Sequence, residues 1–242
     1  MKDATSADHC LSFISSQLRP ASAKAGSGEA PKLAITLSRQ TGAGAWLVAP
    51  RLAELLQEIT RPAASRWTVF DRELVEKVLQ DHNLPASLAR FMPEDRIPYV
   101  QGALQELLGL HPPSWTLVEK TTETIRKLAS LGNVILIGRG ANVITGEMRH
   151  VFHARLVGSI ENRTRCAADF FKLELKAARE FVERTDRGRQ RYLKEHFGAD
   201  VDDPLQYDLT INTDRVPFER AAELIASAAL QKVGFQPPKR GH

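Results

Sequence analysis

The chain has 242 residues, of which 43% are hydrophobic and 26% are charged, and its formal net charge is +4. This composition is typical of a globular protein, so disorder of the whole chain is excluded. No apolar run approaches the roughly 18 residues of a membrane helix, and the N-terminus lacks the basic start and apolar centre of a signal peptide. We therefore expect a cytoplasmic protein of one or two domains, with no membrane contact and with an anionic partner.

Residues 1–31 form a unit separate from the predicted body. Apolar side chains recur at helical spacing before Pro20, namely Leu11, Phe13, Ile14 and Leu18. They predict a short amphipathic helix, and the Ala-, Gly- and Ser-rich residues 21–31 predict a flexible linker. The helix can dock on the body or on a second copy, so a homo-oligomer is one expectation.

The body spans residues 32–235 and is followed by a basic tail, 236–242. Five short apolar runs predict strands at 33–37, 67–70, 134–137, 151–157 and 208–211. Helical stretches separate them, a pattern that predicts an α/β fold with a parallel sheet. Two helical regions, 83–132 and 159–200, are too long for simple crossovers. We expect them to cover the carboxyl ends of the strands, where ligands bind in such sheets.

The segment SRQTGAGAW, Ser38 to Trp46, joins the first strand to the following helix. A Gly-rich turn at a helix N-terminus offers backbone amides to an anion. The phosphate-loop pattern G-x-x-x-x-G-K-[ST] would place Gly at 39, Lys at 45 and Ser or Thr at 46. This chain instead has Arg39, Ala45 and Trp46, so the loop by itself fits a phosphate site and a plain structural turn equally well.

Charged side chains follow the other strands of the predicted sheet. Asp71 and Arg72 follow the second strand, Arg139 follows the third, and Arg163 lies on the helix after the fourth. The carboxyl ends of parallel strands lie at one edge, and the guanidinium fork suits phosphate oxygens. A single arginine there is usually a surface residue, but together these charges favour a phosphate site.

The segment ERTDRGRQRY adds a basic helix. Arg184, Arg187 and Arg191 share one helical face and can close over a polyphosphate, while Asp186 can orient an arginine. The alternatives are a solvated charged face and a nucleic-acid surface. Only one aromatic residue, Tyr192, interrupts the run, which makes nucleic-acid binding the weakest of these readings.

In chain order, the motifs ITLSRQTGAGA, FDRELV, VILIGRGAN, RLVGSIENR, DRGR and YDLTINTDRV resemble the cytidylate kinase-like family of P-loop nucleoside monophosphate kinases. The resemblance covers about residues 32–230. It implies a three-layer P-loop kinase fold with a five-stranded parallel sheet, a helical acceptor-binding insertion at 83–132 and a helical lid at 159–200. It also implies nucleotides as partners, with ATP and Mg²⁺ as cofactors.

The resemblance assigns residues to three roles. Those that bind the nucleotide phosphates are Arg39, Gln40, Thr41, Gly42, Ala43, Gly44, Ala45 and Trp46. Those that bind the acceptor are Asp71, Arg72 and Arg139. Those with catalytic roles are Arg139, Arg163, Asp186, Arg187 and Arg189.

The chain departs from the family at its metal and phosphoryl groups. Ala45 replaces the phosphate-binding lysine, Trp46 replaces the adjacent hydroxyl residue, and no acid ends the third strand, so no metal ligand is predicted. Loss of one such electrostatic group commonly costs on the order of 10² to 10³ in rate. Position alone suggests that Arg39 folds back over the loop to replace the missing charge.

Three functions follow from these residues. The leading one is an ATP-dependent nucleoside monophosphate kinase, a phosphotransferase with a degenerate phosphate loop and cytidylate as the first acceptor to test. The second is a nucleotide- or phosphate-binding module that no longer transfers phosphoryl groups. The third and least favoured is nucleic-acid binding through the basic helix.

Overall fold

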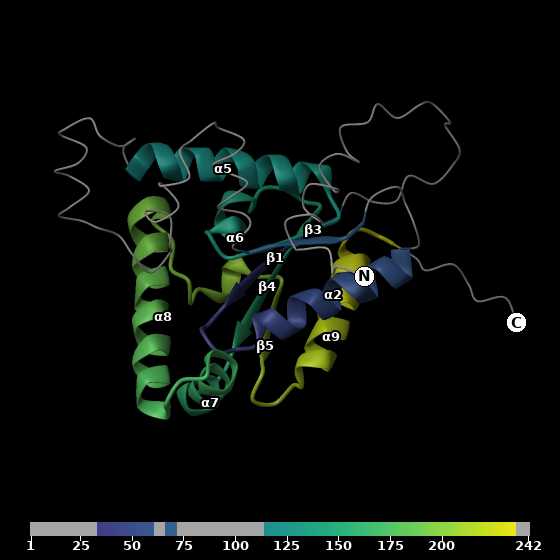
Figure 1. Ribbon diagram of the computed structural model, residues 1–242. Coiled ribbons are helices and arrows are strands. Elements are labelled where there is room, and N and C mark those ends of the chain that lie inside the picture. The colour runs from purple at the N-terminus through teal and green to yellow at the C-terminus, as the bar shows by residue number, and fades with distance from the viewer. Residues whose placement is uncertain (1–32, 61–65, 72–113, 236–242) are drawn as a thin grey trace, which may run out of the picture.

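The computed structural model describes residues 33–60, 66–71 and 114–235 (Figure 1). The predicted N-terminal helix, the basic tail, Arg72 and residues 83–113 of the helical insertion lie outside these ranges.

A five-stranded parallel sheet forms the centre of the described chain, in the order β2-β3-β1-β4-β5. The strands are β1 (Ala34–Arg39), β2 (Thr68–Phe70), β3 (Val134–Ile137), β4 (Val151–Val157) and β5 (Leu209–Asn212). All five predicted strands are confirmed, with ends shifted by at most two residues. β1 and β3 read as apolar runs because the sheet is covered on both faces.

Helices cover the two faces of the sheet (Figure 1). α2 (Ala45–Thr60) and α9 (Phe218–Lys232) share a core with the side chains of Ile35 and Leu37. α5 (Ser114–Leu131) and α6 (Ala141–Ile144) pack on the opposite face, against Ala34 and Leu136. The predicted three-layer α/β architecture is therefore present.

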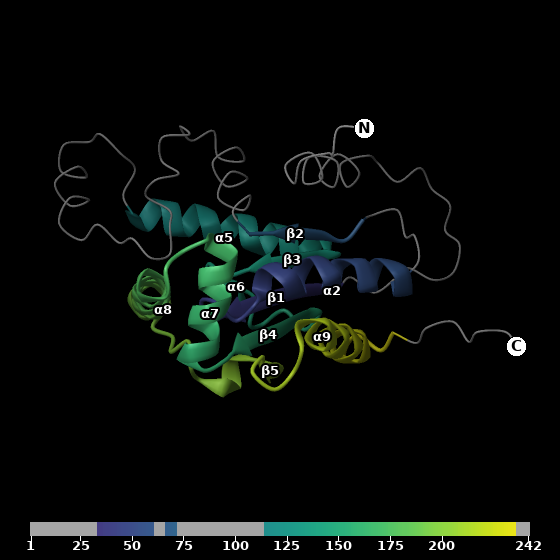
Figure 2. The same ribbon diagram turned by 60° about the horizontal axis from the view of Figure 1, so that its bottom comes forward.

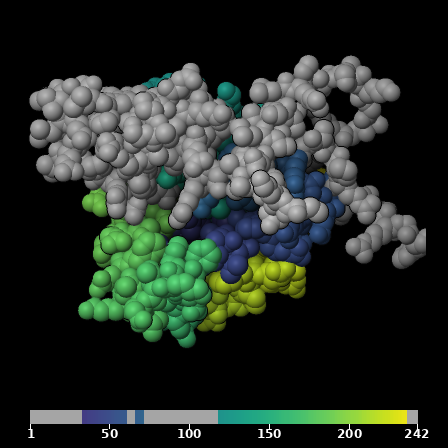
Figure 3. All heavy atoms as spheres, in the orientation of Figure 1, coloured from purple at the N-terminus to yellow at the C-terminus, as the bar shows by residue number. Residues whose placement is uncertain are grey.

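Two further helices, α7 (Ile160–Phe171) and α8 (Leu175–Phe197), lie at the end of the sheet where β4 stops. They pack on each other through Ala167, Ala168, Ala178 and Val182. Both ribbon views place them side by side at this end (Figure 1, Figure 2), and the space-filling view shows them as a green lobe beside the purple start of the described chain (Figure 3). This pair corresponds to the predicted helical region 159–200.

A short 3₁₀ helix, η2 (Pro204–Gln206), leads from this lobe back to β5. None of the helices within the described ranges is long and apolar enough to cross a membrane.

A stripe of buried polar side chains runs between β1 and β4 on the face covered by α5 and α6. Thr36 pairs in register with His153, and Ser38 pairs with Arg155. The Thr36 hydroxyl lies 2.8 Å from His153 Nδ1. Burial, followed by the nearby Lys232 charge, lowers the pKa of His153 from 6.5 to about 4.

The lowered pKa of His153 predicts acid sensitivity of the fold. The unfolded chain binds a proton at this imidazole below about pH 6.5, whereas the folded protein binds it only near pH 4, so stability falls across that window. We expect the stability advantage of the wild type over His153→Asn to shrink by about 3 kcal/mol between pH 7 and pH 4. Urea unfolding at each pH measures it, and a difference that stays constant over this window contradicts the prediction.

Candidate phosphate-binding site

The loop between β1 and α2 is packed tightly against two helices. Gly42 and Gly44 both have left-handed backbone, with φ values of 84° and 83°. A Cβ atom at Gly42 would lie 2.1 Å from the carbonyl oxygen of Arg163, and one at Gly44 would lie 2.2 Å from the ring of Phe218. Both glycines are therefore required by their backbone conformation and by the close approach of α7 and α9.

The turn leaves backbone donors without partners. The amide of Ala43 donates to the carbonyl of Gln40 at 3.1 Å, and the amide of Val48 donates to Gly44 at 3.0 Å as α2 begins. Within the described ranges, no acceptor faces the amides of four loop residues, Gly42, Gly44, Ala45 and Trp46. These residues are largely buried, and buried amides almost always have partners, so an anion at the helix N-terminus suits them.

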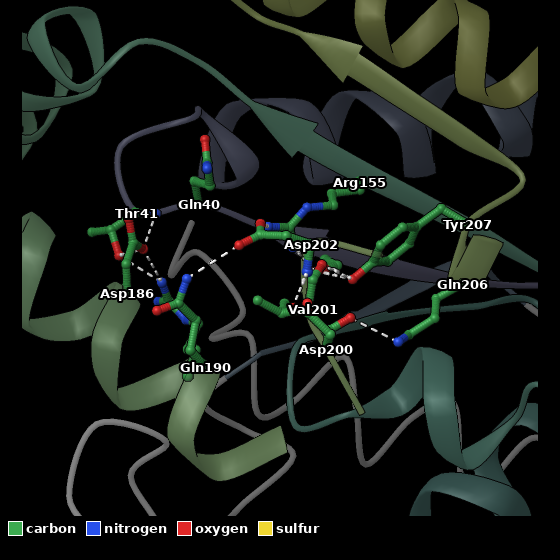
Figure 4. Close-up of polar contacts among 12 residues, drawn as sticks. Gln40, Thr41, Arg155, Asp186, Gln190, Asp200, Val201, Asp202, Gln206 and Tyr207 are labelled. Carbon is green, nitrogen blue, oxygen red and sulfur yellow. Dashed lines mark hydrogen bonds and ion pairs between the residues drawn. The ribbon is translucent and has the colours of Figure 1, made fainter. Parts of the chain in front are cut away.

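A carboxylate from α8 contacts the same loop (Figure 4). Asp186 Oδ1 accepts hydrogen bonds from the Thr41 amide at 2.7 Å and from the Thr41 hydroxyl at 2.8 Å. Arg163 Nη1 donates to Asp186 Oδ2 at 2.6 Å, and Arg189 Nη1 donates to Oδ1 at 3.2 Å. Four donors thus surround one carboxylate, much as they would surround the oxygens of a phosphate.

The same arginines also bind the loop directly. Arg163 Nη1 donates to the carbonyl of Thr41 at 3.0 Å, and its Nε donates to the carbonyl of Gly158 at 2.9 Å. Arg189 Nη1 donates to the Thr41 hydroxyl at 2.5 Å. Gln40 completes the connection, because its side-chain oxygen accepts from the Gly158 amide at 3.0 Å. The loop, α7 and α8 therefore form one hydrogen-bonded unit.

A pocket of about 300 Å³ opens beside this unit. Its polar lining holds five arginines and three acids, an excess of positive charge that favours an anion. The arginines are Arg39, Arg155, Arg163, Arg187 and Arg189, and the acids are Glu183, Asp186 and Asp202.

The predicted basic face of α8 differs from the face that contacts the loop. Arg184, Arg187 and Arg191 are exposed, and Arg187 Nη1 lies 3.9 Å from Glu183 at the pocket wall. The contacts to Thr41 come instead from Asp186 and Arg189. The predicted pairing of Asp186 with an arginine is present, since Asp186 contacts both Arg163 and Arg189.

Of the predicted site residues at the ends of β1, β2 and β3, only some lie at the pocket. Arg39 lines the pocket and its Nη2 lies 3.7 Å from Asp71 Oδ1, so its charge is directed toward the end of β2. Arg139 lies in a left-handed turn with φ 58°, between Gly138 and Gly140, and is not among the residues that line this pocket. Arg72 falls outside the described residues.

The two loop residues that differ from the family pattern, Ala45 and Trp46, both pack against neighbouring side chains. The Ala45 residue is only 6% exposed. The Trp46 ring stacks on Phe170 with centroids 4.5 Å apart and meets the edge of Phe171 at 6.1 Å. An aromatic contact between α2 and the end of α7 thus occupies the position where the family has a hydroxyl side chain.

The pocket contains a second charged pair, Arg155 and Asp202, that the sequence did not predict. Arg155 of β4 is only 4% exposed, and its Nη2 donates to Asp202 Oδ1 at 2.6 Å. Its Nη1 donates to the Ser38 hydroxyl at 2.9 Å and contacts the Tyr207 hydroxyl at 3.4 Å (Figure 4). The available signal was an arginine inside the run 151–157, in which His153 is the other polar residue.

The described residues do not provide a complete set of protein ligands for Mg²⁺. They contain no group of three or more His, Cys, Asp or Glu side chains that could hold a metal. Three acids at this edge are paired with arginine: Asp186 with Arg163, Asp202 with Arg155, and Asp71 with Arg39. Mg²⁺ is usually bound through carboxylate oxygens, which are committed here to guanidinium groups.

The family model described as the cytidylate kinase-like family matches residues 34–215. The chain belongs to this family. No curated protein matches the chain by sequence. The family match and the five-stranded parallel sheet together confirm the P-loop kinase fold that the resemblance implies.

One of the solved structures compared has a TM-score above 0.5 and shares the fold, and two others match more weakly. A structure described as an uncharacterized protein from Eubacterium ventriosum ATCC 27560 is 20% identical, with a TM-score of 0.60, and the match covers 83% of this chain and 99% of that one. A shikimate kinase from Bacteroides thetaiotaomicron is 14% identical, with a TM-score of 0.44. That match covers 82% of this chain and 96% of the shikimate kinase. A shikimate kinase from Acinetobacter baumannii in complex with shikimate is 18% identical, with a TM-score of 0.44. That match covers 83% of this chain and 95% of the shikimate kinase.

The contact at Gly42 predicts a local stability requirement. Gly42→Ala forces a side chain into left-handed backbone and against the Arg163 carbonyl, so we expect a loss of about 3 kcal/mol or more in the free energy of unfolding. Gly198→Ala is the matched control, because Gly198 has φ 64° but nothing within 4 Å of its added Cβ. It should cost only about 1 kcal/mol. Equal losses in the free energy of unfolding for the two variants would mean that the close approach of Gly42 to Arg163 adds nothing to the cost of the substitution.

The Asp186 contacts predict that this carboxylate holds the helix pair on the loop. Asp186→Asn removes the negative charge that Arg163 and Arg189 contact, so both partly buried guanidinium groups lose a carboxylate partner. We expect the free energy of unfolding to fall by about 2 to 3 kcal/mol, as measured by chemical denaturation. Asp169→Asn on the exposed surface of α7 should change it by less than about 0.5 kcal/mol. Similar effects of the two variants would contradict the assignment.

Proposed function

We propose that this protein is a nucleoside monophosphate kinase that binds the phosphates of ATP at the Thr41 loop and transfers the terminal phosphoryl group to a nucleoside monophosphate. The single observation that supports this most is the cage of four donors around the Asp186 carboxylate, formed by Thr41, Arg163 and Arg189. The same donors suit phosphate oxygens, and they meet at the carboxyl ends of parallel strands.

In this proposal the protein contributes position and charge. The unpaired loop amides hold the donor phosphates, and Arg163 and Arg189 stabilise the charge that spreads over the transferring phosphoryl group. Arg187 adds charge at the pocket wall, and Asp186 orients the two arginines. The acceptor lies toward Asp71, Arg72 and Arg139, in line with the bond that breaks, and the reaction needs no covalent intermediate.

In this proposal, arginines supply the positive charge that a lysine at position 45 supplies in the family. Ala45 carries no charge, and the carboxylates of Asp186 and Asp202 are paired with arginines. A guanidinium keeps its charge at every physiological pH and binds two oxygens at once, which makes it an effective substitute. Cytidylate is the first acceptor to test because of the family to which the chain belongs.

A second candidate is a nucleotide-binding module without transfer. The packing of Trp46 on Phe170 and the burial of Ala45 support it, since both family groups have been replaced by side chains that fit the surrounding core. Binding through loop amides and arginines would survive this replacement, whereas transfer would be slowed.

Two measurements separate the candidates. Thermal unfolding with a panel of nucleotides, with and without Mg²⁺, detects binding, because a ligand at 100 times its dissociation constant stabilises by about 2.7 kcal/mol. A transfer assay from ATP to each common monophosphate then detects turnover. Stabilisation without turnover favours the binding module, and the absence of both overturns the proposal.

The kinase proposal makes a specific prediction for Arg189. Arg189→Met removes a donor to Thr41 and should lower kcat/KM by about 10² to 10³. Arg51→Met is the control, because Arg51 pairs with Glu219 between α2 and α9, outside the pocket lining. It should leave kcat/KM within about twofold. Equal rates for the two variants would show that Arg189 has no part in transfer.

Nucleic-acid binding has its own test. The exposed arginines of α8 would give an affinity for DNA or RNA that falls steeply as salt rises. Binding that is absent at low salt excludes this function.

A further inference from the structure

Arg155 is a buried cation on the floor of the pocket. It comes from the interior of β4, outside the phosphate loop and the lid helices, and is only 4% exposed. Burying a guanidinium is costly unless its hydrogen bonds are satisfied. Ser38 and Asp202 supply them at 2.9 and 2.6 Å, and the Tyr207 ring lies 5.4 Å below the guanidinium carbon.

The two main partners of Arg155 differ in how firmly they are held. Ser38 belongs to β1, the central strand, and lies opposite Arg155 in register. Asp202 lies in the segment between α8 and η2, and 51% of its side chain is exposed. Among the described residues, its second oxygen accepts only from the Gln190 side chain of α8, at 3.1 Å (Figure 4). Asp202 is therefore the partner that a ligand can replace.

Comparison with Asp186 supports this distinction. The Asp186 carboxylate is 21% exposed and accepts from a backbone amide, a hydroxyl and two arginines. Asp202 accepts from two side chains and is more than twice as exposed. Fewer donors and greater solvation make Asp202 the easier carboxylate to displace.

Both Arg155 and Asp202 line the pocket, so a ligand anion and the Asp202 carboxylate compete for one guanidinium. We propose that Arg155 is a further phosphate-binding residue and that Asp202 occupies it until a ligand phosphate takes its place. This inference rests on the proposed function only in that the same pocket receives phosphate. The ligand class is a phosphate or polyphosphate, whose oxygens match the donors that Asp202 now engages.

The two members of the pair then have opposite effects on binding. Arg155→Met removes a donor, so the affinity for inorganic pyrophosphate should fall about tenfold. Asp202→Asn removes the competitor, so the affinity should rise about tenfold. Isothermal titration of the full chain with pyrophosphate, at fixed ionic strength and without nucleotide, measures both changes.

Two control variants separate this effect from simpler causes. Glu183→Gln makes the same charge change in the same pocket, where Glu183 contacts Arg179 and Arg187 rather than Arg155, and should alter affinity by less than about threefold. Gln190→Leu frees α8 from Asp202 but keeps the Arg155 pair, and it should leave affinity unchanged. If either control matches the gain of Asp202→Asn, the proposal is wrong.

The remaining outcomes are also decisive. An ion pair that is only structural predicts lower stability and unchanged or weaker binding in both variants, which overturns the proposal. If Arg155→Met does not fold, the Asp202→Asn result decides alone. Failure of pyrophosphate to bind the wild type and Asp202→Asn also overturns it. The opposite shifts can appear even if no nucleotide is turned over, so the kinase proposal and this one fail separately.

Discussion

The contact between Asp186 and Thr41 is the interaction on which the arrangement of the site depends. It links the first strand-to-helix turn to a helix 145 residues later in the chain, and it brings Arg163 and Arg189 to the same carboxylate. Without this carboxylate, the two guanidinium groups and the backbone amide of Thr41 would lose the acceptor that they share. The shape of the pocket follows from that balance, because the helix pair and the loop form its walls.

The site also shows how a phosphate loop can be maintained after its usual side chains have changed. The glycines remain because the backbone conformation and the contacts of Arg163 and Phe218 exclude any side chain there. The positions that carry chemistry elsewhere in the family, 45 and 46, are occupied by packing residues. Positive charge is supplied instead by arginines from β1, β4, α7 and α8, which converge on one pocket.

Much of the architecture could be predicted from the sequence. The strands β1 and β3 are recognisable because a sheet covered on both faces favours runs of apolar residues. The loop and the helix pair follow from glycine spacing and charge pattern. Arg163, Asp186 and Arg189 were found because they lie in motifs that resemble the family.

The rest of the site depends on information that local patterns do not contain. The partner of Arg155 is set by the register of β1 and β4, whose contacting residues lie 117 positions apart. The face of α8 that meets the loop is set by how Ala178 and Val182 pack on α7. The row of arginines at spacings of three and four is a regular pattern, yet its members are exposed and only Arg187 among them lines the pocket, because that packing decides the rotation of the helix.

The close approach of Gly42 to Arg163 has a mechanical consequence. The start of α7 has no gap in which to slide against the loop, and Gln40 fixes the turn before it through Gly158. The contacts of α8 with the loop, by contrast, are made only through side chains, those of Asp186 and Arg189, among the described residues. The first turn of α7 is therefore the place where this helix pair is held most closely to the loop.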